Sequence, residues 1–197
     1  MKTAEELIAF EERVKKAFLA AQIRAPIHLS GGNEEEVIWS FRDVKPDDWV
    51  FSTYRSHYHA LLKGIPEDWL MQEIMAGRSM HINSREYRFF TSAIVGGVLP
   101  IALGTAMGIQ RLRLGHKSKV WVFVGDMAAE SGTFHEVVKY ARLNRLPIFF
   151  TVEDNLLSVN SPTQTVWGNS RLAPEPVVRY GYVRTQHHVG AGQWVTF

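Results

Sequence analysis

The 197-residue chain contains no cysteine, which excludes disulfide bonds, thiolate metal sites and thiol nucleophiles. No apolar run approaches the length of a membrane span, and the N-terminus lacks a basic stretch followed by an apolar one. The formal net charge of +2 is too small to indicate a nucleic-acid partner. We therefore expect a cytoplasmic protein that binds neither membranes nor nucleic acids.

The composition is otherwise that of an ordinary globular protein, with 46% hydrophobic and 21% charged residues. The chain is long enough to bury a full hydrophobic core, and it contains no internal repeat, low-complexity tract or linker. We therefore expect a single domain over residues 1–197.

The middle of the chain has the pattern of a strand, a helix and a second strand. Residues 119–124 form a short apolar run, rich in β-branched and aromatic side chains, that is typical of a buried strand. Apolar residues recur at helical spacing over 131–143, Pro147 ends that pattern, and 148–152 is a second apolar run. This pattern predicts a βαβ unit with parallel strands in an α/β fold.

A polar side chain follows each of these strands. Asp126 follows the first strand and Asn155 follows the second, 29 positions later. Because parallel strands end at the same edge of a sheet, the two side chains can meet there. Carboxylate and amide oxygens suit Mg²⁺, which completes its coordination with phosphate oxygens and water. The N-terminus of the helix after Asp126 suits a diphosphate, and Ala128 and Ala129 allow close approach, so the pattern predicts a Mg²⁺-diphosphate site.

The same stretch resembles the thiamine diphosphate signature, in which Gly-Asp-Gly is followed further along by Asn-Asn. The matching positions are Gly125-Asp126-Met127 and Asp154-Asn155. Their flanks, GDMAAESGTFHE and RLPIFFTVEDN, look most like the alpha subunit of 2-oxo acid dehydrogenase first components of the pyruvate and branched-chain types. The resemblance covers roughly residues 20–165. It implies a three-layer thiamine diphosphate-binding fold, with a mostly parallel sheet and helices on both faces.

The resemblance also implies roles for individual residues at the strand ends. Asp126 and Asn155 would bind Mg²⁺ through their side chains, and Leu157 through its carbonyl oxygen. The residues next to the cofactor diphosphate would be Gly125, Asp126, Met127, Ala128 and Asn155. Two positions depart from the signature: Met127 replaces the second glycine, and Asp154 replaces the first asparagine. The resemblance assigns no role to Asp154.

Two stretches nearer the N-terminus resemble other parts of the same family. His28 lies where the family has a histidine that faces the substrate, and its ordinary pKa near 6.5 would allow proton transfer at neutral pH. A purely structural role for His28 is an equal alternative. Tyr54 and Arg55 match the family's Tyr-Arg-x-His, in which the planar guanidinium suits the terminal phosphate and the phenol adds a hydrogen bond.

Residues 93–100 resemble a family segment whose backbone contacts the aminopyrimidine ring of the cofactor, which implies main-chain contacts from Ala93 and Val95. An apolar helix is expected over 101–114, with Gly104 and Gly108 four positions apart. Small residues at that spacing allow close helix packing, either inside the core or across a subunit interface. Further helices are expected over 3–21 and 66–76, and a strand within 176–185.

In this family the cofactor is activated by a Glu from a separate pyrimidine-binding domain. A second unit of about 150 residues does not fit in 197 residues beside the first, so we expect a beta-type partner subunit in an α2β2 heterotetramer. The first hypothesis is an alpha-type subunit of an enzyme that decarboxylates a 2-oxo acid with thiamine diphosphate and Mg²⁺. The alternatives are half of a split transketolase or acyloin synthase, and a non-catalytic cofactor-binding relative.

Overall fold

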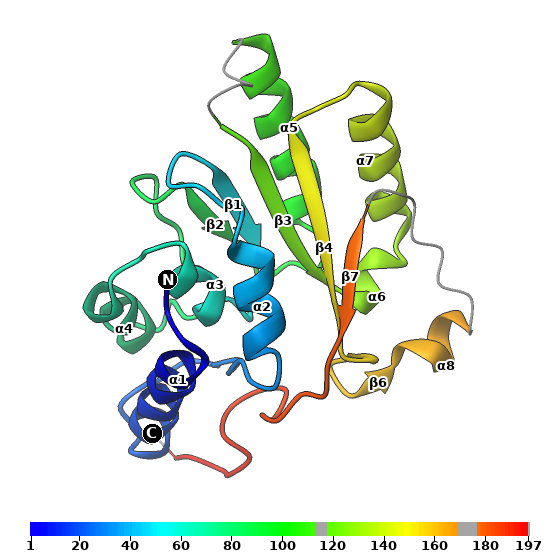
Figure 1. Ribbon diagram of the computed structural model, residues 1–197. Helices are drawn as coiled ribbons and strands as arrows, with labels where there is room; N and C mark the ends of the chain where they lie inside the picture. The colour runs from blue at the N-terminus through cyan, green and yellow to red at the C-terminus, as the bar shows by residue number, and fades with distance from the viewer. Residues whose placement is uncertain (113–117, 169–176, 197) are drawn as a thin grey trace.

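A five-stranded parallel sheet forms the centre of the structure, a computed structural model that describes residues 1–112, 118–168 and 177–196 (Figure 1). The strand order is β2-β1-β3-β4-β7, and every neighbouring pair is parallel. The strands are β1 Trp49–Ser52, β2 Phe89–Thr91, β3 Val120–Gly125, β4 Ile148–Asp154 and β7 Val178–Gly181. The predicted parallel βαβ unit and the strand expected within 176–185 are therefore confirmed.

Helices cover both faces of this sheet and give the expected three layers (Figure 1). One face carries α1 Ala4–Leu19, α2 Glu34–Phe41, α3 His57–Leu62 and α4 Glu67–Met75; the other carries α5 Val98–Arg111 and α7 Gly132–Leu143. Alternate residues of β3 pack into the cores on the two faces of the sheet, because successive side chains of a strand point to opposite faces. Phe123 belongs to the first core, and Val122 and Val124 belong to the second.

The helix boundaries follow signals that are visible in the sequence. Thr3 and Glu6 form a capping box at the start of α1, and Pro66 directly precedes α4. The helix expected over 101–114 is α5, which ends at Arg111; residue 114 lies outside the described residues. A Cβ atom added to Gly104 or Gly108 would have no atom within 4 Å, so these glycines do not serve close packing inside the described chain.

The helical region after Asp126 is divided into two pieces. The four-residue helix α6, Asp126–Ala129, starts directly at the end of β3. The long helix α7 begins separately, because the Ser131 side chain accepts a hydrogen bond from the backbone N–H of Phe134 at 3.3 Å. The sequence therefore predicted the long helix correctly, but the turn that follows Asp126 belongs to α6.

Beyond β4 the chain forms a small hairpin, β5 Leu157–Ser158 with β6 Ser161–Pro162, and then α8 Thr163–Trp167. After β7 the C-terminal segment runs back along the carboxyl edge of the sheet and ends beside α1 (Figure 1). It is fixed there by hydrogen bonds from the Thr185 N–H to the Gly31 carbonyl, at 3.2 Å, and from the Gly190 N–H to the Ile27 carbonyl, at 2.9 Å. None of the described helices has the length and hydrophobicity of a membrane span.

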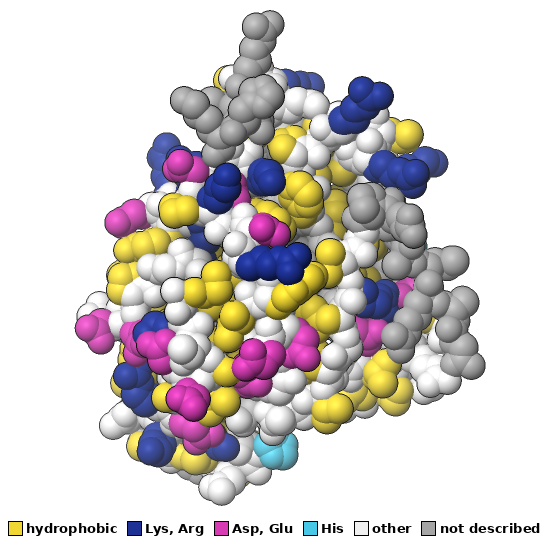
Figure 2. Space-filling model, viewed as in Figure 1, with side chains coloured by type: hydrophobic (Ala, Val, Ile, Leu, Met, Phe, Trp, Pro, Cys, Tyr) yellow, Lys and Arg dark blue, Asp and Glu magenta, His cyan; other side chains and the backbone are white. Residues whose placement is uncertain are grey.

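The surface of one face has two distinct characters. Figure 2 shows acidic side chains over α2, whose first turn contains Glu34, Glu35 and Glu36. Higher on the same face, hydrophobic side chains reach the surface over the strands (Figure 2). Trp121 of β3 packs against the first core and stacks on Phe149 of β4 with ring centroids 4.8 Å apart, and Phe149 remains 42% exposed. The helices therefore cover this face of the sheet only in part.

Candidate functional site

A pocket lies at the carboxyl ends of the central strands, with about 720 Å³ of empty space when the open solvent at its mouth is included. It is lined by the residues that follow β1, β2, β3 and β4, and also by the C-terminal segment. Ligands of open α/β sheets bind at this edge, because the strand ends direct their following residues into one crevice. The pocket is therefore the candidate functional site.

Asp126 directly follows β3 and is one of the residues that line the pocket. Its side chain is almost fully buried, and its carboxylate accepts a hydrogen bond from the Thr163 hydroxyl at the start of α8. Burial, with a further contribution from the nearby Asp154 carboxylate, raises the pKa of Asp126 above its ordinary value. The ionised form is thus costly here, and a bound cation would lower that cost.

Asn155 is held in a defined orientation at the end of β4. Its Oδ1 accepts a hydrogen bond from the Leu157 N–H at 3.0 Å, and its Nδ2 donates to the Tyr182 hydroxyl at 3.0 Å. The same loop contains two non-glycine residues in the left-handed region, Leu156 with φ 64° and Val159 with φ 57°. Such backbone conformations are unfavourable for residues with a Cβ, and they tend to cluster at functional sites.

The structure supplies a role for Asp154, which the resemblance left without one. Its carboxylate forms an ion pair with Arg179 of β7 at 3.0 Å and accepts a hydrogen bond from the Leu156 N–H at 3.0 Å. Arg179 also pairs with Glu130 at 3.0 Å. Asp154 therefore joins β4 and β7 and supports the loop that presents Asn155.

The donor atoms at this edge suit a hard divalent cation. They are the carboxylate of Asp126, the amide oxygen of Asn155 and the backbone carbonyl of Leu157, all three from residues that line the pocket. Mg²⁺ prefers oxygen ligands and uses few protein side chains. In residues 1–112, 118–168 and 177–196, no cluster of three or more histidine or acidic side chains is placed to hold a metal ion. A cation in the pocket would therefore rely on this mixed oxygen set.

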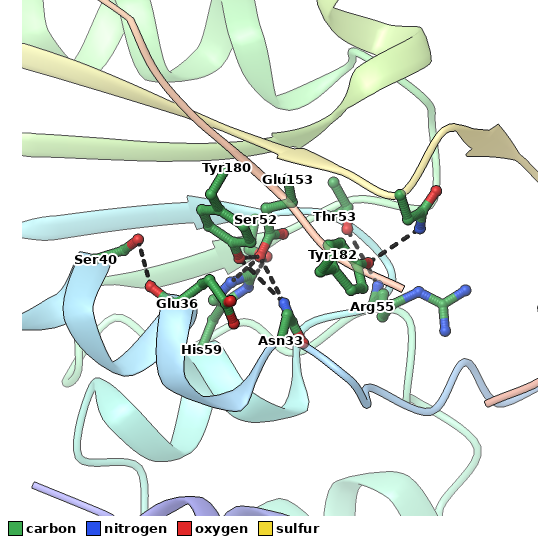
Figure 3. Close-up of polar contacts among 11 residues, drawn as sticks. Asn33, Glu36, Ser40, Ser52, Thr53, Arg55, His59, Glu153, Tyr180 and Tyr182 are labelled. Carbon is green, nitrogen blue, oxygen red and sulfur yellow. Dashed lines mark hydrogen bonds and ion pairs between the residues drawn. The ribbon is translucent and has the colours of Figure 1, made fainter. Parts of the chain in front are cut away.

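Arg55 also lines the pocket, and it differs from these oxygens in chemical character because it is a cation. Its guanidinium donates to the Leu29 carbonyl and, at 3.2 Å, to the carbonyl of His188 in the C-terminal segment. Its backbone N–H donates to the Thr53 hydroxyl at 3.2 Å (Figure 3). Burial lowers the pKa of Arg55, yet a guanidinium remains charged at neutral pH. Arg55 thus brings a buried positive charge to the pocket and joins two distant segments.

His28 lies behind this side of the pocket, and it is not among the lining residues. It is 7% exposed, and its ring packs 4.5 Å from Tyr54 and 5.0 Å from His188, measured between centroids. Burial, the charge of Arg55 and the neighbouring His188 lower the pKa of His28 to about 3. The expectation that His28 titrates near its ordinary pKa of 6.5 is therefore wrong. The imidazole is neutral at neutral pH, and its buried Nδ1 has no hydrogen-bond partner within the described chain.

A buried polar cluster underlies the pocket (Figure 3). Glu153, which lines the pocket, accepts hydrogen bonds from Tyr180 and, at 3.2 Å each, from His59 and Asn33. His59 in turn bonds the Ser52 hydroxyl at 2.7 Å through Nδ1. Burial alone would raise the pKa of Glu153, but His59 and the hydrogen bond from Tyr180 hold it below its ordinary value. The cluster keeps an ionised carboxylate under the pocket.

The pocket brings together most of the residues that the sequence indicated. From the first half of the chain it contains Tyr54, Arg55 and Val95. From the βαβ unit it contains Gly125, Asp126, Met127, Ala128, Asn155 and Leu157. His28 and Ala93 are not part of the lining, although Ile94 and Gly96 beside Val95 are.

The sequence did not indicate Glu153, Tyr182, Arg184 or His188, which also line the pocket. Three of these belong to the C-terminal segment, where residues 182–189 alternate between half-buried and exposed. Polar and apolar residues alternate only weakly in this segment, so its sequence does not indicate a buried face. The separation of Tyr182, Arg184 and His188 by multiples of two was the available sign that they share one face of an extended segment.

Known proteins resemble this chain over most of its length. The family model described as "Dehydrogenase E1 component" matches residues 2–166. The alpha-3 subunit of the chloroplastic pyruvate dehydrogenase E1 component of Arabidopsis thaliana is 30% identical over 77% of this chain and 39% of the relative. The alpha subunit of acetoin:2,6-dichlorophenolindophenol oxidoreductase of Bacillus subtilis is 31% identical over 76% of this chain and 47% of the relative. The alpha subunit of the pyruvate dehydrogenase E1 component of Porphyra purpurea is 32% identical over 74% and 47%. The chain therefore spans less than half the length of these relatives.

Proposed function

The chain belongs to the dehydrogenase E1 component family, and on that premise we propose that it is an alpha-type subunit of a thiamine diphosphate-dependent enzyme that decarboxylates a 2-oxo acid. In this proposal the pocket binds the Mg²⁺-diphosphate end of the cofactor. The observation that carries it is the meeting of Asp126, Asn155 and Leu157 in one pocket that also contains the guanidinium of Arg55. Oxygen ligands for a divalent cation and a permanent cation for phosphate oxygens are what a metal-bound diphosphate requires.

The residues present fit that group. The buried carboxylate of Asp126, with its raised pKa, gains from a nearby divalent cation. Asn155 is already oriented by Tyr182, so it loses little side-chain freedom when it binds a metal. Small side chains at Gly125 and Ala128 leave room for phosphate oxygens near the backbone.

Each part of the pocket then has a defined task. Thiamine diphosphate supplies the electron sink for decarboxylation, and the protein supplies position and electrostatics. Asp126, Asn155 and the Leu157 carbonyl would hold Mg²⁺, and the backbone at Val95 would meet the aminopyrimidine. The neutral imidazole of His28 can donate or accept a hydrogen bond, but its low pKa makes it a poor store for a proton at neutral pH.

A beta-type subunit is proposed as the partner that closes the pocket. At the pocket mouth Ile94 is 74% exposed and Val95 is 61% exposed, and on the adjoining helix Ile101 is 46% exposed. The open space beside Gly104 and Gly108 continues this surface along α5. The relatives are named as alpha subunits, which supports an assembly with a second type of subunit, in our proposal an α2β2 heterotetramer.

The Bacillus subtilis relative favours a second candidate of the acyloin class. Its name describes an acetoin oxidoreductase, and its identity to this chain, 31%, lies between the 30% and 32% of the two pyruvate dehydrogenase relatives. Turnover assays with pyruvate, a branched 2-oxo acid and acetoin, each with an artificial electron acceptor, separate the two candidates. A protein that binds the cofactor with a partner present but turns over none of these would be the non-catalytic alternative.

Titration calorimetry with thiamine diphosphate tests the proposal directly. Saturable binding is expected in the presence of Mg²⁺, and its loss is expected when EDTA removes the metal. The lone chain should not decarboxylate a 2-oxo acid, whereas co-expression with a beta-type subunit should produce turnover. Absence of cofactor binding with Mg²⁺ would contradict the proposed function, and saturable turnover by the lone chain would contradict the need for a partner.

A further inference from the structure

The C-terminal segment forms a wall of the pocket, although it lies beyond the residues that match the family model. From residue 182 to 189 every second residue is half-buried and the intervening residues are exposed. This period of two places Tyr182, Arg184 and His188 on the side of the pocket. The hydrogen bonds of Thr185 to Gly31 and of Gly190 to Ile27 attach the wall to the N-terminal half.

Arg184 is a second arginine among the residues that line the pocket. Its Nη1 donates to the Val159 carbonyl at 3.2 Å, in the loop that also contains Asn155 and Leu157. A guanidinium has five N–H donors, so one such bond leaves most of its capacity for a ligand. Within the described chain, no carboxylate forms an ion pair with Arg184.

The two guanidinium groups differ in how their donors are used. Arg55 donates from Nη1 to the Leu29 carbonyl and from Nη2 to the His188 carbonyl, which holds the C-terminal segment in place. Among the described residues, Arg184 donates to one backbone carbonyl, that of Val159. The charges of Arg55 and Arg184 both disfavour protonation of His188, so the two cations act on the same small region. Like charges in one pocket repel, and an anionic ligand between them would relieve that repulsion.

We propose that Arg184 is a phosphate-binding residue, which the C-terminal segment contributes to the diphosphate site. This inference rests on the proposed function, because the ligand is the diphosphate of the cofactor. A diphosphate carries more negative charge than one Mg²⁺ neutralises, so a further guanidinium among the lining residues has an electrostatic role. Its contact with Val159 would place it over the loop that holds the metal ligands Asn155 and Leu157.

The test compares three ligands by titration calorimetry, all with Mg²⁺: thiamine diphosphate, inorganic pyrophosphate and thiamine. Arg184→Gln should weaken binding of both phosphorylated ligands about 10- to 100-fold, the range expected when a charge-assisted hydrogen bond is lost. Arg184→Lys should recover part of the affinity, and raising the salt concentration should reduce the difference between variant and wild type. Thiamine, which has no phosphate, should bind the Arg184→Gln variant and the wild type equally or fail to bind both.

Arg24→Gln is the matched control, since it removes one exposed positive charge that is not part of the pocket. It should leave all three titrations unchanged. Thermal melting of both variants checks folding; if Arg184→Gln melts early, Arg184→Lys alone is compared with Arg24→Lys in the same titrations. Wild-type affinity for thiamine diphosphate in a folded Arg184 variant would overturn this inference alone, whereas a wild-type chain that binds no phosphorylated ligand would overturn the proposed function.

A carboxylate could use the same guanidinium, so pyruvate is titrated as a fourth ligand into the cofactor-saturated protein. If Arg184→Gln weakens only pyruvate binding and leaves both phosphorylated ligands unchanged, Arg184 recognises the substrate and the inference is overturned. Loss of pyrophosphate binding with unchanged pyruvate binding supports it.

Discussion

The two sides of the pocket are built in different ways. The Asp126–Asn155 side follows two adjacent strands, β3 and β4, whose residues pair continuously from Val120–Ile148 to Gly125–Glu153. The Arg55–His188 side depends on contacts between the segments around residues 27–32 and 183–190, which are far apart in the sequence. The first side is placed by one local βαβ unit and then supported by later residues, among them Tyr182 and Arg179. The second side is formed entirely by contacts between distant segments, so it exists only once the whole chain has folded.

The two sides also differ in electrostatic character. Burial raises the pKa of Asp126, so the first side favours the approach of a cation. On the second side burial and guanidinium charges lower the pKa values of His28 and His188, so that side favours an anion. A metal-bound diphosphate has a cation at one end and phosphate oxygens around it, and it matches this division.

The largest effect is expected from a substitution that changes the first side alone. Asp126→Ala deletes the only carboxylate in the proposed metal-ligand set, so Mg²⁺-dependent binding of thiamine diphosphate should fall below detection. Changes to residues that merely support metal ligands cost about 10- to 100-fold in metal affinity, so loss of a ligand should cost more. Calorimetry gives the affinity and circular dichroism checks the fold. Asp43→Ala, which removes an exposed carboxylate, is the matched control, and unchanged affinity in Asp126→Ala would refute the metal assignment.

A smaller effect is expected when the second side is loosened. Arg55→Lys keeps the charge but loses the planar fork that reaches both Leu29 and His188. Cofactor affinity should fall about tenfold, since one charge-assisted hydrogen bond contributes roughly 1.5–3 kcal/mol. Hydrogen exchange of the Gly190 N–H, which bonds Ile27, should become faster in this variant and stay unchanged in Asp126→Ala. Equal exchange in both variants would mean that the two sides are not separable in this way.

The pH dependence of stability should have opposite signs on the two sides. His28 has a folded pKa of about 3 against 6.5 when unfolded, so the unfolded chain binds more protons between these values. Its contribution to stability is therefore present above pH 6.5 and is lost as the pH falls toward 3. Asp126 has a folded pKa above its ordinary 3.8, so its ionised form destabilises the fold at neutral pH and this penalty disappears as the pH falls.

Urea unfolding from pH 7 to pH 4 measures both contributions. His28→Gln should flatten the loss of stability on acidification, because the variant no longer has the imidazole that protonates on unfolding. Asp126→Asn should raise the urea midpoint at pH 7, where the wild type has a buried charge, and should still lose Mg²⁺-dependent cofactor binding. A lower midpoint for Asp126→Asn at pH 7 would show that Asp126 stabilises the fold rather than the ligand.

The smallest expected effect concerns the loop between the two sides. Leu156 has a φ of 64° and a half-exposed side chain, so Leu156→Gly should stabilise the protein by roughly 0.5–1 kcal/mol. Leu157→Gly is the matched control, because Leu157 is not in the left-handed region and its replacement should destabilise the fold. Thermal melting compares the two variants, and equal destabilisation by both would mean that the φ of Leu156 carries no strain.

Much of the first side could be predicted from the sequence. The apolar runs of β3 and β4, the Ser131 cap of α7 and the position of Pro147 place both strand ends at one edge. The shared edge then brings Asp126 and Asn155 into one pocket without any knowledge of distant contacts. The division of the helical region into α6 and α7 was less predictable, because a four-residue helix has no period that a sequence pattern can reveal.

By itself, the sequence determined the βαβ unit, the parallel sheet and the place of Asp126 and Asn155 at one sheet edge, because strand and helix signals act over a few neighbouring residues. Only the tertiary structure decided the acid–base state of His28, the partners of Glu153 and the place of Arg184 in the pocket. A pKa depends on burial and on charges that the fold brings near, and a wall formed by an extended segment depends on where that segment docks. Both are properties of contacts across more than a hundred residues of chain, such as that of Arg55 with His188.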